Sequence, residues 1–160
     1  MAFNFSQSNK ALPLKTRMGI RDNNESFETS LAAIRTATGI DFAFEVHGDV
    51  LAFSKAIDER YEDRLGEIFF GASSGVLQSL VTCLTNGCAD EMVQEDLQDT
   101  CSAKLLVFRV KLEGRPSGGL YHPLSIENGV LFVDFYADAV WSNVDEVGWT
   151  KLEDVPRITA

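Results

Sequence analysis

The strongest constraint on the fold is the segment between residues 40 and 56, where apolar and polar residues alternate on both sides of Gly48-Asp49. Alternation with period two is typical of a β-strand with one buried face. Glycine at the first central position is what a type II′ two-residue turn requires. The segment therefore predicts a β-hairpin with Phe44 opposite Phe53, because only this register collects the large apolar side chains on one face.

Two later segments, residues 104–112 and residues 129–137, alternate in the same way and are expected to be strands. The pair Asn128-Gly129, just before the second of them, is a turn signal. A further short strand is expected within residues 120–125.

Helical spacing of apolar residues separates these strands. It predicts a helix over residues 24–37, then either two helices over 58–70 and 73–85 or one kinked helix, then a short acidic helix within 89–100. The glycine cluster at residues 71–75 indicates a break or a close backbone crossing. A phosphate-binding loop is the alternative, but the strand before it and the Lys-Ser/Thr after it are missing.

Together these elements predict an α+β domain, with an antiparallel sheet of four or five strands and helices packed on one face. The length of 160 residues and the hydrophobic content of 45% suit one domain. We expect this domain to comprise residues 22–160. Residues 1–21 hold four of the 14 basic residues and none of the 24 acidic ones. They are therefore expected to form a basic N-terminal arm that lies across the acidic body.

Charge and cysteine content limit the classes of partner and the location. A net charge of -10 argues against nonspecific binding of nucleic acid or of an anionic membrane. No stretch approaches the roughly 18 apolar residues of a membrane span. Three cysteines are too few for a disulfide scaffold and favour a reducing, cytoplasmic location. The basic, acid-free start is also typical of a mitochondrial transit peptide, which is the alternative location.

Glu45 and His47 are the candidate catalytic pair. Two positions apart on one strand, they share a face whose other side chains are small, which leaves room for a ligand. The carboxylate could orient the imidazole as a general base. The competing interpretation, two polar side chains at a solvated turn, is favoured because His47 adjoins the predicted turn.

A zinc site of three thiolates and one imidazole is the candidate metal centre, formed by Cys83, Cys88, Cys101 and His122. The cysteine spacing is wider than zinc sites usually show, and buried reduced cysteine is the more common state. We therefore expect neither a metal nor another cofactor.

No motif identifies a reaction, so the sequence favours a non-catalytic protein-interaction module or complex subunit. The alternative is a small-molecule-binding domain or enzyme that uses Glu45 and His47. A homodimer or another protein partner is expected, and aromatic side chains are typical of such interfaces. The candidate contact residues are Phe132, Tyr136, Trp141 and Trp149.

An exposed sheet edge is the expected route to self-association. The segment 104–112 carries Lys104, Arg109 and Lys111, which would guard it against strand addition. The segment 129–137 is therefore the expected contact edge.

Overall fold

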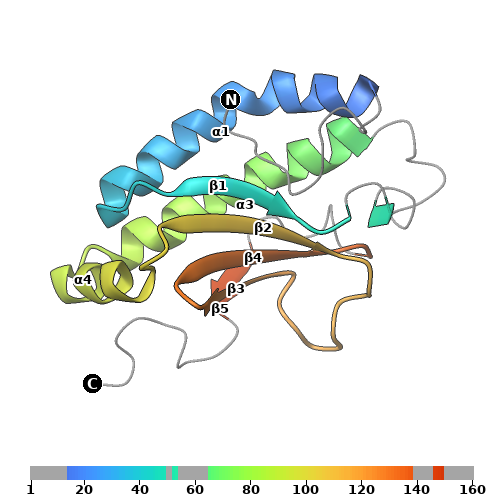
Figure 1. Ribbon diagram of the computed structural model, residues 1–160. Coiled ribbons are helices and arrows are strands. Elements are labelled where there is room, and N and C mark those ends of the chain that lie inside the picture. Colours follow the sequence, from blue (N-terminus) through green and yellow to red (C-terminus); the bar gives the residue numbers. More distant parts are fainter. Residues whose placement is uncertain (1–13, 50–51, 54–64, 139–145, 150–160) are drawn as a thin grey trace.

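The computed structural model describes residues 14–49, 52–53, 65–138 and 146–149 (Figure 1). The elements in chain order are α1 (Leu14–Thr38), β1 (Ala43–His47), α3 (Leu65–Gly87), α4 (Glu91–Thr100), β2 (Leu105–Lys111), β3 (His122–Glu127), β4 (Val130–Tyr136) and β5 (Val147–Trp149). The protein is therefore α+β, as the sequence predicts.

The five strands form one mixed sheet in the order β1-β2-β4-β3-β5. β1 pairs with β2, β2 with β4 and β3 with β5 in parallel, and β3 pairs with β4 in antiparallel orientation. The prediction of an antiparallel sheet is therefore wrong. The connection from β1 to β2 contains α3 and α4, and a crossover of this length is what two parallel neighbours need.

The predicted hairpin over residues 40–56 is also wrong. Phe44 is aligned with Leu106 of β2 and not with Phe53. Phe53 belongs instead to a helical turn after β1. Residues 50–51 and 54–56 lie outside the described part of the chain.

Asp49 explains why the chain leaves β1 in this way. Its carboxylate accepts a hydrogen bond of 3.0 Å from the Ala52 amide, and its carbonyl accepts one of 2.8 Å from the Phe53 amide. Asp is a preferred residue for capping the start of a helical turn. Gly48 does adopt the positive φ that the sequence predicts, at 105°. Gly48-Asp49 therefore begins a helical turn and does not reverse the strand.

Helix α1 is longer than predicted, since it begins at Leu14 and not near residue 24. It crosses the expected boundary between the arm and the domain at residue 21. Its C-terminus agrees with the prediction: Gly39 follows the helix with a φ of 71°, and its amide donates to the Arg35 carbonyl at 2.8 Å.

Helix α3 runs without a break through the glycine cluster at residues 71–75. Within that cluster the Ser74 hydroxyl lies 2.7 Å from the Ser26 hydroxyl of α1. The small residues therefore mark a close helix crossing, one of the two predicted possibilities. The acidic helix α4 forms as predicted, with the Asp90 carboxylate capping its first turn at 2.8 Å from the Met92 amide.

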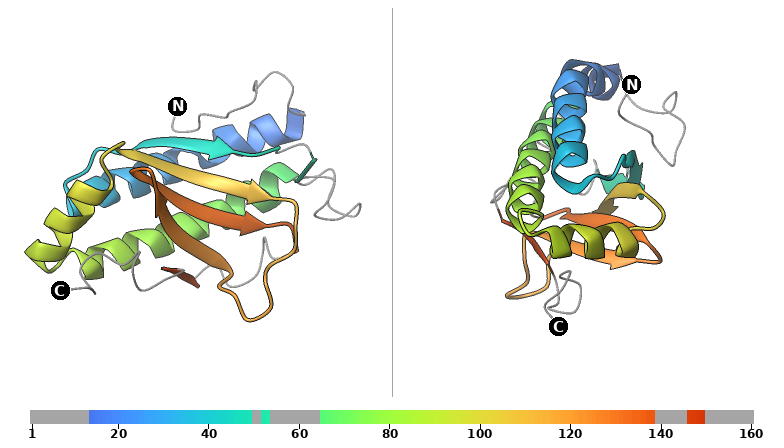
Figure 2. Two further views of the ribbon diagram at one scale, coloured as in Figure 1. Left: turned by 60° about the horizontal axis from the view of Figure 1, so that its bottom comes forward. Right: turned by 90° about the vertical axis from the view of Figure 1, so that its left-hand side faces the viewer.

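α1 and α3 cover one face of the sheet and enclose the core (Figure 2). The centre of the core is aromatic. The centroid of the Phe27 ring lies 5.4 Å from that of Phe44 and 6.2 Å from that of Phe108. The Phe108 ring is in turn 4.9 Å from that of Phe135. Rings at these separations add to the free energy that burial itself contributes.

The segments predicted as later strands form β2 and β4. β4 is joined to β3 by Asn128 and Gly129, both with positive φ, which is the geometry of a type I′ hairpin turn. Both β2 and β4 lie inside the sheet, and its described edges are β1 and β5. The expectation that residues 129–137 form an edge for strand addition is therefore wrong.

Candidate functional site

The outer face of the sheet, which points away from α1 and α3, carries a cluster of charged and aromatic side chains. Successive side chains of a strand point to opposite faces, and Phe108 and Val133 occupy the core face. The outer face therefore receives the residues next to them. We call the following residues the outer-face cluster: Arg109 and Lys111 of β2, Phe132 and Asp134 of β4, and Glu127 of β3.

Arg109 is the centre of this cluster. Its Nε and Nη2 donate to the Asp134 carboxylate at 2.7 and 3.2 Å. Its Nη1 and Nη2 donate to the Glu127 carboxylate at 3.2 and 3.3 Å. The guanidinium also lies over the Phe132 ring, 4.3 Å from its centroid. Four of its five N–H groups are thus engaged, and the side chain is held in one orientation.

The charges of the cluster balance one another. Lys111 Nζ lies 3.3 Å from the second oxygen of Asp134, so two cations face two carboxylates. The pKa of Arg109 is raised, mainly by its hydrogen bond with Asp134. The pKa of Glu127 is lowered, mainly by the hydrogen bond that it accepts from Arg109. An incoming anion would therefore have to compete with carboxylates already in place.

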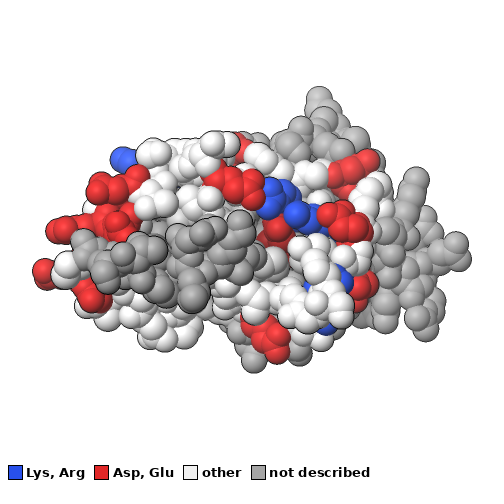
Figure 3. Space-filling model, turned by 90° about the horizontal axis from the view of Figure 1, so that it is seen from below, with Lys and Arg blue, Asp and Glu red and all other residues white. Residues whose placement is uncertain are grey.

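The cluster is partly open to solvent. The exposed fraction of the side chain is 25% for Arg109, 27% for Lys111 and 50% for Glu127, whereas that of Asp134 is 8%. Figure 3 shows basic atoms near the middle of this side of the molecule with acidic atoms around them. The carboxylate that anchors Arg109 is thus buried, and the outer parts of the cluster can be touched by a partner.

Glu45 and His47 lie on the same face of β1, as predicted. His47 Nε2 is 2.6 Å from Glu45 Oε2, and about a third of each side chain is exposed. His47 is aligned with Arg109 of β2, so the pair borders the outer-face cluster. Neither Glu45 nor His47 lines any of three hollows of the described surface, which have volumes of about 520, 550 and 50 Å³.

The four candidate zinc ligands do not form a metal centre. Cys83 and Cys88 line a cavity of about 50 Å³ beside Trp149. Cys101 is buried in the core, and the ring of His122 packs 5.0 Å from that of Phe135. Among the described residues, no group of three or more His, Cys, Asp or Glu side chains is placed to hold a metal ion.

Burial raises the pKa of all three thiols, that of Cys101 to about 12. The proximity of Cys83 adds to the rise at Cys88. A raised pKa lowers the fraction of thiolate, which is the form that attacks electrophiles and binds metals. The Cys101 thiol therefore has the character of a buried apolar group, and those of Cys83 and Cys88 are partly buried.

Of the three predicted contact residues that the structure describes, Phe132 and Tyr136 lie on the outer face of β4, whereas Trp149 lies elsewhere. Phe132 is half-buried beneath Arg109 on the outer face. Tyr136 is buried, with Lys111 Nζ 5.9 Å from its ring centroid. Trp149 of β5 lines the small cavity, and Trp141 lies outside the described residues.

The outer-face cluster could not be recognised from the sequence pattern alone. The alternation in residues 104–112 and 129–137 does place Arg109 and Asp134 on the faces opposite the apolar side chains of their strands. This alternation was the signal in the sequence that pointed to the cluster. The missing information was that β2 and β4 are parallel neighbours. Without that pairing, nothing places a cation at residue 109 beside a carboxylate at residue 134.

None of the helices in the described residues is both long enough and apolar enough to span a membrane. Comparisons of the chain with models of known protein families, with curated proteins and with solved structures find no match.

Proposed function

We propose that this chain is a non-catalytic protein-interaction module and that the outer face of its sheet binds a protein partner. The observation that carries the proposal is Arg109, held by four hydrogen bonds over the Phe132 ring on the face that α1 and α3 leave uncovered. Arginine and aromatic residues are enriched among the residues that dominate binding energy. A side chain already fixed in place loses little entropy when a partner binds.

The charge balance of the cluster favours a protein over an anionic ligand. Asp134 and Glu127 neutralise Arg109 and Lys111, so phosphate groups would find no uncompensated cation there. The net charge of -10 adds a repulsion for nucleic acid over the whole molecule. A partly exposed mixture of apolar rings and neutralised charges resembles a protein interface.

The second candidate is a small-molecule-binding or catalytic site at Glu45 and His47. The hydrogen bond of 2.6 Å between them favours it, because a carboxylate can orient an imidazole for proton transfer. About a third of each side chain is exposed at the end of β1, as expected of two solvated polar groups, which is why we rank this function second.

Site-specific photo-crosslinking tests the proposal. A photoreactive phenylalanine analogue is placed at residue 132 of the full-length chain, or at the exposed control Thr82 on α3, in the native cells. We expect one discrete protein adduct from residue 132 and none from residue 82. Ser125→Arg, beside Phe132 on β3, should abolish the adduct, whereas Thr82→Arg should leave it.

Three outcomes would contradict the proposal: no adduct from residue 132, equal adducts from both positions, or no effect of Ser125→Arg. The second candidate has a separate signature. If a small molecule binds the wild type and is lost in Glu45→Ala and His47→Ala at unchanged stability, the pair is a ligand site.

We propose a cytoplasmic location because all three cysteines are free thiols. Fractionation of the native cells tests this, and recovery in the mitochondrial fraction would favour the alternative location.

A further inference from the structure

Helix α1 carries a continuous exposed ridge on the side that faces away from the sheet. At 100° per residue, positions 14, 17, 18, 21, 25, 28 and 32 fall within one narrow stripe of the helix. The opposite side of α1 packs into the core through Ile20, Phe27 and Ile34. All seven ridge residues are exposed: Leu14, Arg17, Met18, Arg21, Glu25, Glu28 and Ala32.

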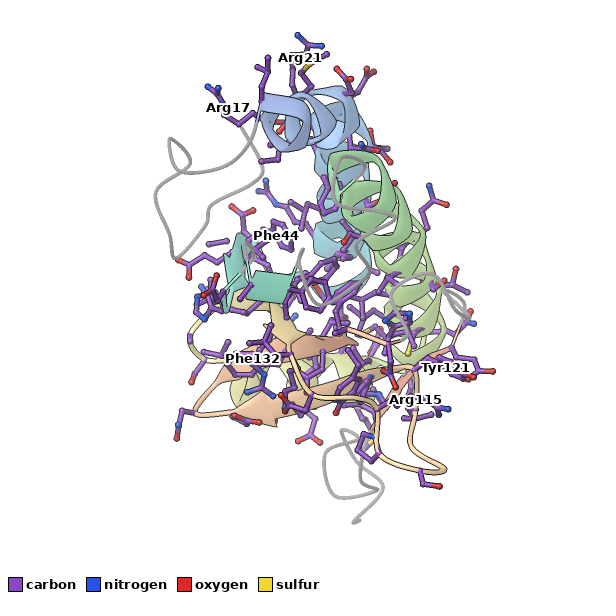
Figure 4. The ribbon with its side chains drawn as sticks, turned by 90° about the vertical axis from the view of Figure 1, so that its right-hand side faces the viewer. Arg17, Arg21, Phe44, Arg115, Tyr121 and Phe132 are labelled. Atoms are coloured by element: carbon purple, nitrogen blue, oxygen red, sulfur yellow. The ribbon has the colours of Figure 1, made fainter. Side chains whose placement is uncertain are left out.

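The ridge begins with apolar side chains in solvent. Leu14 is 64% exposed and Met18 is 42% exposed, and they are neighbours one helical turn apart. Figure 4 shows Arg17 and Arg21 projecting outward at the same end of α1, on the opposite side of the molecule from Phe132. Adjacent exposed apolar residues flanked by charges are typical of a contact surface.

The order of charges along the ridge is self-complementary. Arg17 and Arg21 come first, and Glu25 and Glu28 follow one turn later. If a second α1 lies antiparallel to the first, with the two-fold axis near residue 23, Arg21 of each copy meets Glu25 of the other. In the same register Arg17 comes within reach of Glu28 of the other copy. Self-complementarity of this kind is what a two-fold interface requires.

The same register places Leu14 of one copy at Ala32 of the other, where a groove of about 550 Å³ runs beside the ridge. Leu31, Ala32 and Phe42 provide the apolar part of its lining. The small side chain of Ala32 leaves room for a leucine, so the most exposed apolar residue of α1 would be buried.

A second groove, of about 520 Å³, lies on the other flank of the ridge between α1 and α3. Asp22 and Glu25 line it together with the hydroxyls of Ser26 and Thr29. In the antiparallel arrangement this groove receives Arg21 of the other copy. Within the described part of one chain, the only ion pair of Arg21 is with Asp22, at 2.8 Å, and both side chains are more than half exposed. Such exposed pairs contribute little to stability, so Arg21 can change partner at low cost.

We propose that a second copy of this chain binds along the α1 ridge, with the two helices antiparallel in a symmetric dimer. The contact from Leu14 to Ala32 is about 27 Å long at 1.5 Å per residue. A strip of this length and one helix wide is smaller than a typical stable interface, so the dimer is weak and depends on protein concentration. The inference goes beyond the proposed function, because it assigns a partner to a second surface, remote from the outer-face cluster.

Analytical ultracentrifugation of the full chain, over about a hundredfold range of concentration, tests the dimer. The wild type should pass from monomer to dimer, and high salt should weaken the association. Arg17→Glu with Arg21→Glu makes the ridge wholly acidic, and Glu25→Arg with Glu28→Arg makes it wholly basic. Each double variant alone should stay monomeric, and an equimolar mixture of the two should form a heterodimer.

The matched control is Glu91→Arg with Glu95→Arg on the exposed side of α4, which changes the net charge as much as the basic-ridge variant does. It should dimerise like the wild type, and circular dichroism should show the same helix content for every variant. A monomeric wild type, dimers of either ridge variant alone, or a mixture that fails to associate would overturn the proposal. None of these results would alter the crosslink expected from residue 132, so the two proposals fail independently.

Discussion

Arg109 and Asp134 are aligned across the parallel pairing of β2 and β4, and hydrogen bonds of 2.7 and 3.2 Å join the guanidinium to the carboxylate. The carboxylate also holds Lys111 at 3.3 Å. With only 8% of its side chain exposed, Asp134 is the buried anchor of two cations on the outer face. The stability of this face therefore depends on one carboxylate more than on any other member of the cluster.

Asp134→Asn should lower the free energy of unfolding by about 2 kcal/mol, because it weakens charge-assisted hydrogen bonds and leaves partly buried cations under-compensated. Urea unfolding measures the change. Glu127→Gln, which alters the more exposed carboxylate on the same arginine, is the control and should cost less than about 1 kcal/mol. Equal losses from the two variants would show that burial of Asp134 is unimportant.

Gly48→Ala should lower the free energy of unfolding by at least about 2 kcal/mol. Its φ of 105° is unfavourable for a residue with a side chain, and an added Cβ would lie 2.6 Å from the Val110 carbonyl oxygen. Gly118→Ala is the matched control, since Gly118 also has a positive φ, of 73°, but open space around it. Gly118→Ala should lower the free energy of unfolding by only about 1 kcal/mol, because it adds backbone strain without a steric clash. Similar losses would mean that the close approach to Val110 is absent.

Local features of the sequence predicted several elements correctly. The positive φ at Gly48, the turn at Asn128-Gly129 and the acidic helix α4 all follow from the preferences of nearby residues. These preferences act within one turn of the chain and need no knowledge of what packs nearby.

Strand pairing could not be predicted in the same way. Phe44 lies beside Leu106, about sixty residues later in the chain, and no local preference selects that partner over Phe53. The outer-face cluster could not be predicted for the same reason, because the cluster depends on which strands are neighbours. Helix α1 was predicted too short, from residue 24, although Ile20 before that residue is also buried in the core.

Glu127 should make stability depend on pH in the acid range. The hydrogen bond from Arg109 lowers the pKa of this carboxyl in the folded protein. Its contribution is therefore fully present above the ordinary glutamate pKa of 4.5 and is lost as the pH falls through the lowered value. Glu127→Gln should flatten the fall of the free energy of unfolding below about pH 4.5, as measured by urea unfolding at a series of pH values.

The control for this pH effect is the Arg109→Gln background, in which the cause of the shift is gone. There Glu127→Gln should no longer change the slope of stability against pH. If it still flattened the slope, the carboxyl would owe its lowered pKa to another group.

Cys101 should resist alkylation in the native protein far more than in the unfolded chain. Burial, with a smaller effect of nearby Cys88, raises the pKa of its thiol from 9.0 to about 12. At pH 8 the thiolate fraction is then about a thousandfold lower than in the unfolded chain, and the thiolate is the reactive form. Iodoacetamide labelling followed by mass spectrometry, with a sample in urea as the control, measures this ratio.

The same shift predicts an alkaline loss of stability. A thiol whose pKa is raised on folding stabilises the native state fully below pH 9, and this contribution is lost as the pH rises from 9 to about 12. Cys101→Ala should therefore make the free energy of unfolding fall less steeply over that range, although the lost side chain lowers stability at neutral pH. An unchanged alkaline slope, or native labelling as fast as labelling in urea, would mean that the Cys101 thiol is not buried in the folded protein.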